Sequence, residues 1–324
     1  QNEPDEYVKE TFDFGLLEDF DHLYRYSQFA YMTEGIKPND IVQCKTDVVI
    51  GRPTQYHHNN NGLRIRKHYD KNTAHPQTKV NILTLLSGEQ QTHNYYAEHG
   101  FMYGNPVLRE TYAEIKDVEE EHVTMYESLI DPTESMWEKL LIHEFTEVCN
   151  YYTCIEDEVD ERIKKTWELF LDIELGHLQA VADLFKKYEK RDPEEVIGSE
   201  IVIPCKFKSQ KEYVKKILET QVDKRLEDHG QFTSVKDLSK DWLSYKIQNK
   251  QNELGSPTEN AVKLAFIYHT RDITAGTKDL RNKEPEILKK SLQPETAKNT
   301  VLPDELEKQI KEHQAYKEKI KNLI

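Results

Sequence analysis

The stretch "TWELFLDIELGHLQAVADLF", residues 166–185, has the spacing of an amphipathic helix. Its apolar residues recur every three or four positions, which predicts one buried stripe. They are Trp167, Phe170, Leu171, Leu178, Val181, Leu184 and Phe185. Glu174 and His177 lie on the same stripe, three residues apart, where an apolar residue is expected. The pattern therefore predicts that a carboxylate and an imidazole face the core.

The same interruption recurs in the three helical patterns that precede this one. They are "NILTLLSGEQQTHNYY" (81–96), "LRETYAEIKDVEEEHVTMYESLI" (108–130) and "WEKLLIHEFTEVCNYYTCI" (137–155). Each carries acidic residues on its apolar stripe, and the second also carries a histidine. The residues predicted to point inward are Glu89, Glu119, His122, Glu144, Glu147, Glu174 and His177.

Five carboxylates in one core need positive charge. Burying them without partners would cost many kcal/mol, and two divalent cations would offset their charge. A carboxylate and a histidine three residues apart lie on one helix face, and facing helices that carry such pairs build two-metal sites in bundles. Oxygen and imidazole ligands suit iron or manganese. Acidic residues off the stripes, including Glu120 and Glu121, are predicted to lie in solvent.

The rest of the sequence predicts an all-α protein in three parts. Residues 1–78 hold a helix over 5–33 and a long irregular segment. Residues 79–194 form a four-helix bundle, and residues 195–324 form a polar helical extension. The helix over 5–33 is predicted to bury an apolar side composed of Phe12, Leu16, Phe20, Leu23 and Tyr24.

Composition narrows the classes of function. A net charge of −15 disfavours nucleic acid as a partner, because phosphate backbones need a basic surface. The sequence contains no run of about 18 apolar residues, so it predicts no membrane span. The four cysteines form no C-x-x-C pair and are expected to be reduced thiols in a cytoplasmic protein. The loop histidines His57, His58, His68 and His75 are expected to be ordinary polar residues.

The four helical patterns resemble the rubrerythrins, a family of ferritin-like di-iron proteins. "NILTLLSGEQQTHNYY" resembles their first helix, "EEEH" and "ELGH" their two Glu-x-x-His helices, and "HEFTEVCNYY" their third helix. The resemblance covers residues 79–190 and implies a ferritin-like four-helix bundle that holds two iron ions, with manganese or a mixed pair as alternatives. It also implies peroxide reduction.

Residue roles follow from the same resemblance. Glu119 and Glu174 would bridge the two metals, and Glu144 and His177 would bind one of them. Glu89 and Glu147 would bind the other, with His122 replacing Glu147 on reduction. Tyr96, seven residues after Glu89, is a candidate to lie near the metal pair.

The sequence departs from the family in two respects. It has no cysteine pairs for a rubredoxin domain, so the electron donor is expected to be a separate protein such as a rubredoxin. Only 22 residues separate His122 from Glu144, too few for the long crossover that joins parallel helices. The first helix pair is therefore expected either to use a compressed crossover or to swap with a partner chain in a homodimer.

Three functions stay open at this point. The first is an oxidoreductase that reduces hydrogen peroxide or dioxygen at a di-iron centre. The second is a di-metal oxygenase or oxidase that acts on an organic substrate, which a buried apolar cavity beside the metals would favour. The third is a non-enzymatic iron-binding or storage protein, which an open acidic channel would favour.

Overall fold

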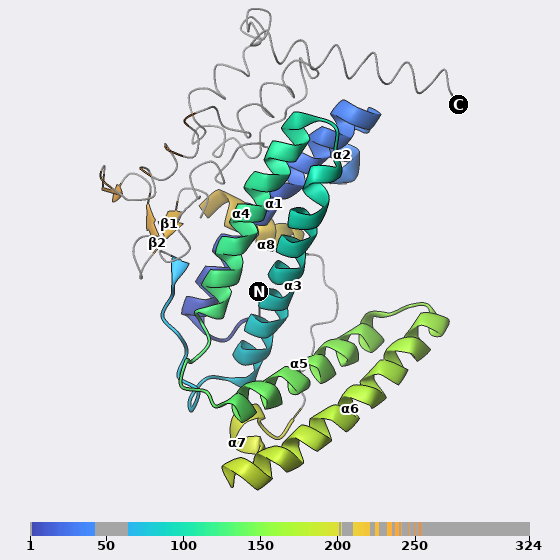
Figure 1. Ribbon diagram of the computed structural model, residues 1–324, viewed down its shortest axis with the longest axis vertical. Coiled ribbons are helices and arrows are strands. Elements are labelled where there is room, and N and C mark those ends of the chain that lie inside the picture. The colour runs from blue at the N-terminus through green and yellow to red at the C-terminus, as the bar shows by residue number, and fades with distance from the viewer. Residues whose placement is uncertain are drawn as a thin grey trace, which may run out of the picture.

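The structure is a computed structural model, shown in Figure 1. It describes residues 2–42, 64–200, 202, 210–220, 224–226, 232–234, 237–239, 241, 246, 250 and 253. The helices are α1 (Glu6–Glu34), α2 (Pro38–Ile41), α3 (Pro76–His99), η3 (Gly100–Met102), α4 (Pro106–Glu127), α5 (Met136–Asp157), α6 (Glu161–Glu189), α7 (Glu194–Ile197) and α8 (Lys211–Thr220). Strands β1 (Lys224–Leu226) and β2 (Phe232–Ser234) pair antiparallel. The predicted helical class is confirmed for this part of the chain.

Short polar residues set the helix starts. Asn105 caps α4 by accepting hydrogen bonds from two backbone N–H groups, and Pro106 occupies the first turn. Ser135 begins α5 with a reciprocal capping box to Glu138, and Asp160 caps α6. These residues lie at or beside the predicted breaks between the helical patterns, so the four predicted helices are confirmed as α3, α4, α5 and α6.

The four helices form two hairpins rather than one closed bundle within the chain. In Figure 1, α1 runs alongside α3 and α4, while the α5–α6 hairpin lies obliquely across the end of that group. The short link from α4 to α5 turns α5 away from α4, and α5 packs on α3 instead. The ligand-bearing faces of α3–α4 and of α5–α6, which were predicted to meet, therefore lie apart within one chain.

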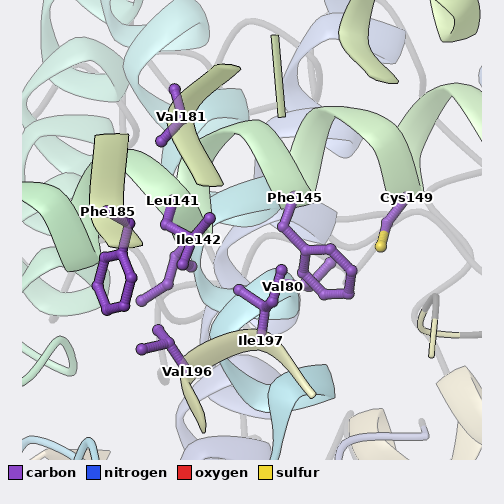
Figure 2. Close-up of a cluster of buried hydrophobic side chains, with 9 residues drawn as sticks. All are labelled: Val80, Leu141, Ile142, Phe145, Cys149, Val181, Phe185, Val196 and Ile197. Atoms are coloured by element: carbon purple, nitrogen blue, oxygen red, sulfur yellow. The ribbon is translucent and has the colours of Figure 1, made fainter. Parts of the chain in front are cut away.

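One apolar cluster joins the two hairpins. It gathers side chains from α3, α5, α6 and α7, as Figure 2 shows. Its buried members are Val80, Leu141, Ile142, Phe145, Cys149, Val181, Phe185, Val196 and Ile197. Only Val181 and Phe185 of α6 are fully buried. The prediction that all of the α6 stripe is buried is wrong, because Phe170 and Leu184 lie on an exposed flank of the helix.

Helix α1 buries Tyr24 of the predicted apolar side and packs Phe12, Leu16 and Phe20 on core clusters, but it also turns a polar face inward that was not predicted. Leu23 is exposed, whereas Glu18, Asp21, His22, and Arg25 are buried. Helix α1 packs directly on α4, and one contact between these helices needs a glycine. A Cβ at Gly15 would lie 1.9 Å from the hydroxyl oxygen of Tyr126, so only a residue without a side chain fits there.

Several predictions concern residues outside the described part of the chain. They include His57, His58, Cys44, Cys205 and most of the C-terminal extension. Among the described helices, none combines the length and the apolar character needed to cross a membrane.

Candidate metal centre

Three helices bring buried carboxylates and imidazoles together at one point. Glu89 of α3 and Glu119 and His122 of α4 meet there, as the sequence predicts. Helix α1 adds Glu18, Asp19 and His22, which were not predicted. The six residues comprise four carboxylates and two histidines.

The contacts within this group are close. Nδ1 of His122 lies 3.2 Å from Oε2 of Glu119 and 3.5 Å from Oε2 of Glu89. Its Nε2 contacts Oε2 of Glu18. Nδ1 of His22 lies 3.2 Å from Oε1 of Glu119. Ligand atoms of Asp19, Glu89, Glu119 and His122 all lie within 4.8 Å of one another, close enough to share a cation.

Two buried arginines balance other acids beside the group. Arg25 pairs with Asp21 at 2.7 Å and with Glu114 at 2.9 Å. Arg64 donates from Nε to Glu121 at 2.7 Å, and its Nη2 lies 3.9 Å from Glu18. The prediction that Glu121 is solvent-exposed is wrong, because Arg64 makes its burial favourable.

The remaining charge suits two divalent cations. The group itself holds four carboxylates, those of Glu18, Asp19, Glu89 and Glu119, and two imidazoles, with Arg64 at the edge of the group beside Glu18. Four carboxylates and two neutral histidines balance two divalent ions, and this is the ligand set of di-metal carboxylate bundles. Nε2 of His22 is an independent sign, because it is buried with no hydrogen-bond partner among the described residues. The residues present therefore fit a two-metal centre.

Without a metal, the residues of the group shift one another's pKa values in opposite directions. Burial raises the pKa of Glu89 to about 8 and that of Asp19 to about 6. Burial opposes the charged form of His122, but Glu89 and Glu18 raise its pKa well above the usual value. Burial also opposes charge on Glu119, yet hydrogen bonds with His122 and His22 lower its pKa. Neighbouring acids are thus driven to opposite protonation states.

The other predicted ligands gather on the α5–α6 hairpin. Nδ1 of His177 lies 3.0 Å from Oε2 of Glu174 and 3.8 Å from Oε2 of Glu144. The His177 side chain is 58% exposed. Glu147 is half-buried and joins neither group. Within one chain, the seven expected ligands are thus divided between two places, and Glu147 and His122 do not share a site.

Tyr96 lies in an aromatic cluster beside the group on α1, α3 and α4. Its ring centroid is 5.8 Å from that of Tyr26 and 5.7 Å from that of Tyr112. Burial first, and then the carboxylate of Glu119, raise the pKa of Tyr96. Tyr96 is therefore expected to keep its hydroxyl proton at neutral pH.

The other two described histidines of the irregular segment have local roles. His75 caps α3 by accepting a hydrogen bond from the backbone of Gln77, and the His68 ring contacts the Tyr69 carbonyl oxygen.

The α1 ligands carried a signal in the sequence. Asp19 and His22 are three residues apart, the same spacing as Glu119 and His122. The signal was obscured because apolar residues occur on both sides of α1, so the apolar stripe did not identify the buried face.

Comparison of the chain with protein-family models, characterised proteins and solved structures gave no match.

Proposed function

We propose that this chain is a di-metal carboxylate oxidoreductase that reduces hydrogen peroxide or dioxygen. The observation that carries the proposal is the convergence of four carboxylates and two histidines on α1, α3 and α4, where Nε2 of His22 has no hydrogen-bond partner within the described part of the chain. The set is suited to iron, with manganese or a mixed pair as alternatives. The resemblance of residues 79–190 to rubrerythrins favours the same chemistry.

The residues that would hold the metals are those of the three-helix group. When bound, two ferrous ions supply the two electrons that a peroxide or oxygen reaction needs. The protein supplies charge balance and a water-poor setting. His122 is fully buried, and Glu18 and Glu119 are at most 2% exposed. An external reduced protein, such as a rubredoxin, would restore the electrons.

The expected ferritin-like bundle and homodimer belong to the same proposal. On α6, Phe170, Ile173, His177 and Leu184 follow the spacing of a helix-packing seam and are exposed. The ligand face of α3–α4 is already covered by α1, so it cannot pack on this seam. The seam therefore suits the α5–α6 hairpin of a second copy of the chain. Two hairpins would together provide four carboxylates, from Glu144 and Glu174, and two copies of His177. A four-helix bundle would then form between two chains.

A second candidate function is oxidation of an organic substrate at the same centre. A cavity that is lined partly by Asp19 and Glu89 favours it.

Metal loading followed by rapid mixing tests the proposal. The full chain is loaded anaerobically with ferrous iron, freed of excess metal, and analysed for iron. Wild type should hold at least two ions per chain. Glu119→Ala should lose about two, whereas His177→Ala should lose only metal held on α5–α6. The loaded protein is then mixed with peroxide or oxygen and followed by absorbance.

Faster oxidation by peroxide than by oxygen supports peroxide reduction as the activity. Fewer than one ion per wild-type chain would refute the proposal. Equal iron content in wild type and Glu119→Ala would refute the placement on α1, α3 and α4.

A further inference from the structure

A cavity of about 480 Å³ lies beside the candidate metal centre, among α1, α3, α5 and α8. Asp19 and Glu89, which belong to the centre, form part of its wall. A molecule in this cavity would therefore contact the two ligands that separate it from the metals.

The cavity extends along several turns of α3. Asn81, Leu85 and Glu89 line it, and residues four apart lie on one face of a helix. Asn81 and Glu89 are eight residues apart, which corresponds to about 12 Å along the axis. The shape suits a chain-like molecule better than a compact one.

Besides the acids Asp19 and Glu89, large apolar and aromatic side chains line the cavity. Phe12 and Leu16 come from α1, Leu85 from α3 and Tyr126 from α4. Phe12 and Tyr126 pack edge to face, with ring centroids 5.5 Å apart. An apolar group that lies against these side chains would be removed from water.

The far end of the cavity is polar. Gln77 donates to Asn81 at 2.7 Å, and Asn81 donates to Glu3 at 2.7 Å. Asn150 of α5 also lines the cavity. Side-chain amides with remaining hydrogen-bonding capacity suit a small polar group on the bound molecule.

Charge restricts the choice of molecule. None of the described residues that line the cavity is a lysine or an arginine. Its ionisable walls include the acids Glu3, Asp13, Asp19 and Glu89. A carboxylate or phosphate placed there would be desolvated without a cationic partner, so an anionic molecule is disfavoured.

We infer that this cavity binds an elongated, mainly apolar molecule that carries an uncharged or amine head group, with its apolar end at Asp19 and Glu89. The inference rests on the second candidate function of the same metal centre, because it makes this molecule the organic substrate that the centre oxidises. The reaction would break one C–H bond and form one C–O bond. Dioxygen is the oxidant, and an external donor supplies two electrons, which with two protons convert the second oxygen atom to water.

Calorimetric titration of the full chain tests the binding step. The probes are 1-octanol, octylamine and octanoate, each added to metal-free and to Mn²⁺-loaded protein. One molecule of octanol or octylamine should bind per chain. In metal-free protein, octanoate should bind at least about tenfold more weakly, because none of the described residues that line the cavity is a cationic partner for its charge.

A cavity-filling variant with a matched control locates the site. Leu85 lines the cavity but is 38% exposed, so Leu85→Trp should fold and narrow the space. It should weaken octanol binding at least about tenfold while iron content stays unchanged. Leu23 has a similar exposure of 37% on α1 and does not line the cavity, so Leu23→Trp should bind octanol like wild type.

Fluorine spectroscopy tests the orientation. An octylamine with fluorine on its terminal carbon should show strong line broadening in Mn²⁺-loaded protein, and much less in Glu119→Ala treated in the same way.

The outcomes separate the two proposals. If metal loads as proposed but none of the probes binds, or octanoate binds best, the cavity inference is wrong and the metal function stands. If octanol binds and Leu85→Trp abolishes its binding, yet no metal loads, the proposed function is wrong. Broadening of the fluorine signal that is equal in wild type and Glu119→Ala would overturn the orientation.

Discussion

Replacement of His22 by alanine should reduce the stability that metal confers on the protein. His22 is 4% exposed, and its Nδ1 lies 3.2 Å from Glu119. If its Nε2, which has no hydrogen-bond partner in the described ranges, binds a metal, the variant loses one of six ligands. Even partners that only orient metal ligands are worth about 10–100-fold in affinity, so a ligand should be worth at least that.

The magnitude follows from linkage between binding and folding. A 10–100-fold loss of affinity at a fixed excess of metal removes about 1.4–2.7 kcal/mol of metal-dependent stabilisation. At roughly 2–4 °C per kcal/mol for a folded unit of this size, the rise in Tm on adding metal should shrink by about 3–11 °C. The truncation also leaves a void, but that cost is present with and without metal and cancels in the difference.

The assay is thermal unfolding by circular dichroism, with and without Mn²⁺, on three variants. His22→Ala should show the reduced rise, and His99→Ala, which removes a half-buried histidine of α3 that belongs to neither candidate group, should match wild type. His177→Ala tests the other group. A full rise in His22→Ala together with a lost rise in His177→Ala would refute the assignment of metal to α1, α3 and α4.

Three further outcomes are expected. Burial opposes charge on Glu138, but hydrogen bonds from Lys71 and Arg191 lower its pKa to about 2. The stability that this carboxylate contributes is therefore complete above about pH 4.5 and is lost as pH falls towards 2. In urea unfolding, Glu138→Gln should lower the free energy of unfolding by about 2 kcal/mol at pH 7 and by little near pH 2. Phe185→Ala should cost about 3–5 kcal/mol in the same assay, whereas Phe101→Ala, at a site 66% exposed, should cost little. Wild type should sediment as a dimer when Mn²⁺ is added and as a monomer with a chelator, and a variant such as His177→Ala that stays dimeric only with metal would contradict the pairing through α6.

Local chemistry made most of the helical segments predictable. Caps such as Asn105 and Ser135 stand at the helix starts, and the periodic apolar residues of α4 are buried as expected. Half of the candidate centre followed too, because Glu89, Glu119 and His122 interrupt a stripe that is otherwise apolar. These features are set by residues within a few positions of one another.

Tertiary placement could not be read in the same way. Periodicity states that α6 has an apolar side but not which helix covers it, so the exposure of His177 was not foreseen. Helix α1 is apolar on more than one side, and its buried face is decided by long-range pairs such as Arg25 with Glu114. The missing half of the centre lies on that face.

The contact at Gly15 has a consequence for ion selectivity. Gly15, Glu18 and His22 follow one another at intervals of three and four residues on α1, and Tyr126 stands one turn beyond His122 on α4. Because the Tyr126 hydroxyl occupies the space of a Cβ at position 15, the Tyr126 side chain packs directly against the backbone of α1 and sets the separation of the two helices there. The same separation fixes the distance between the ligands Glu18 and His22 on α1 and His122 on α4, which lie one or two turns away. Ligands at a fixed spacing discriminate between ions by radius. The centre should therefore bind small transition metals and exclude Ca²⁺, whose coordination needs longer bonds and more oxygen ligands.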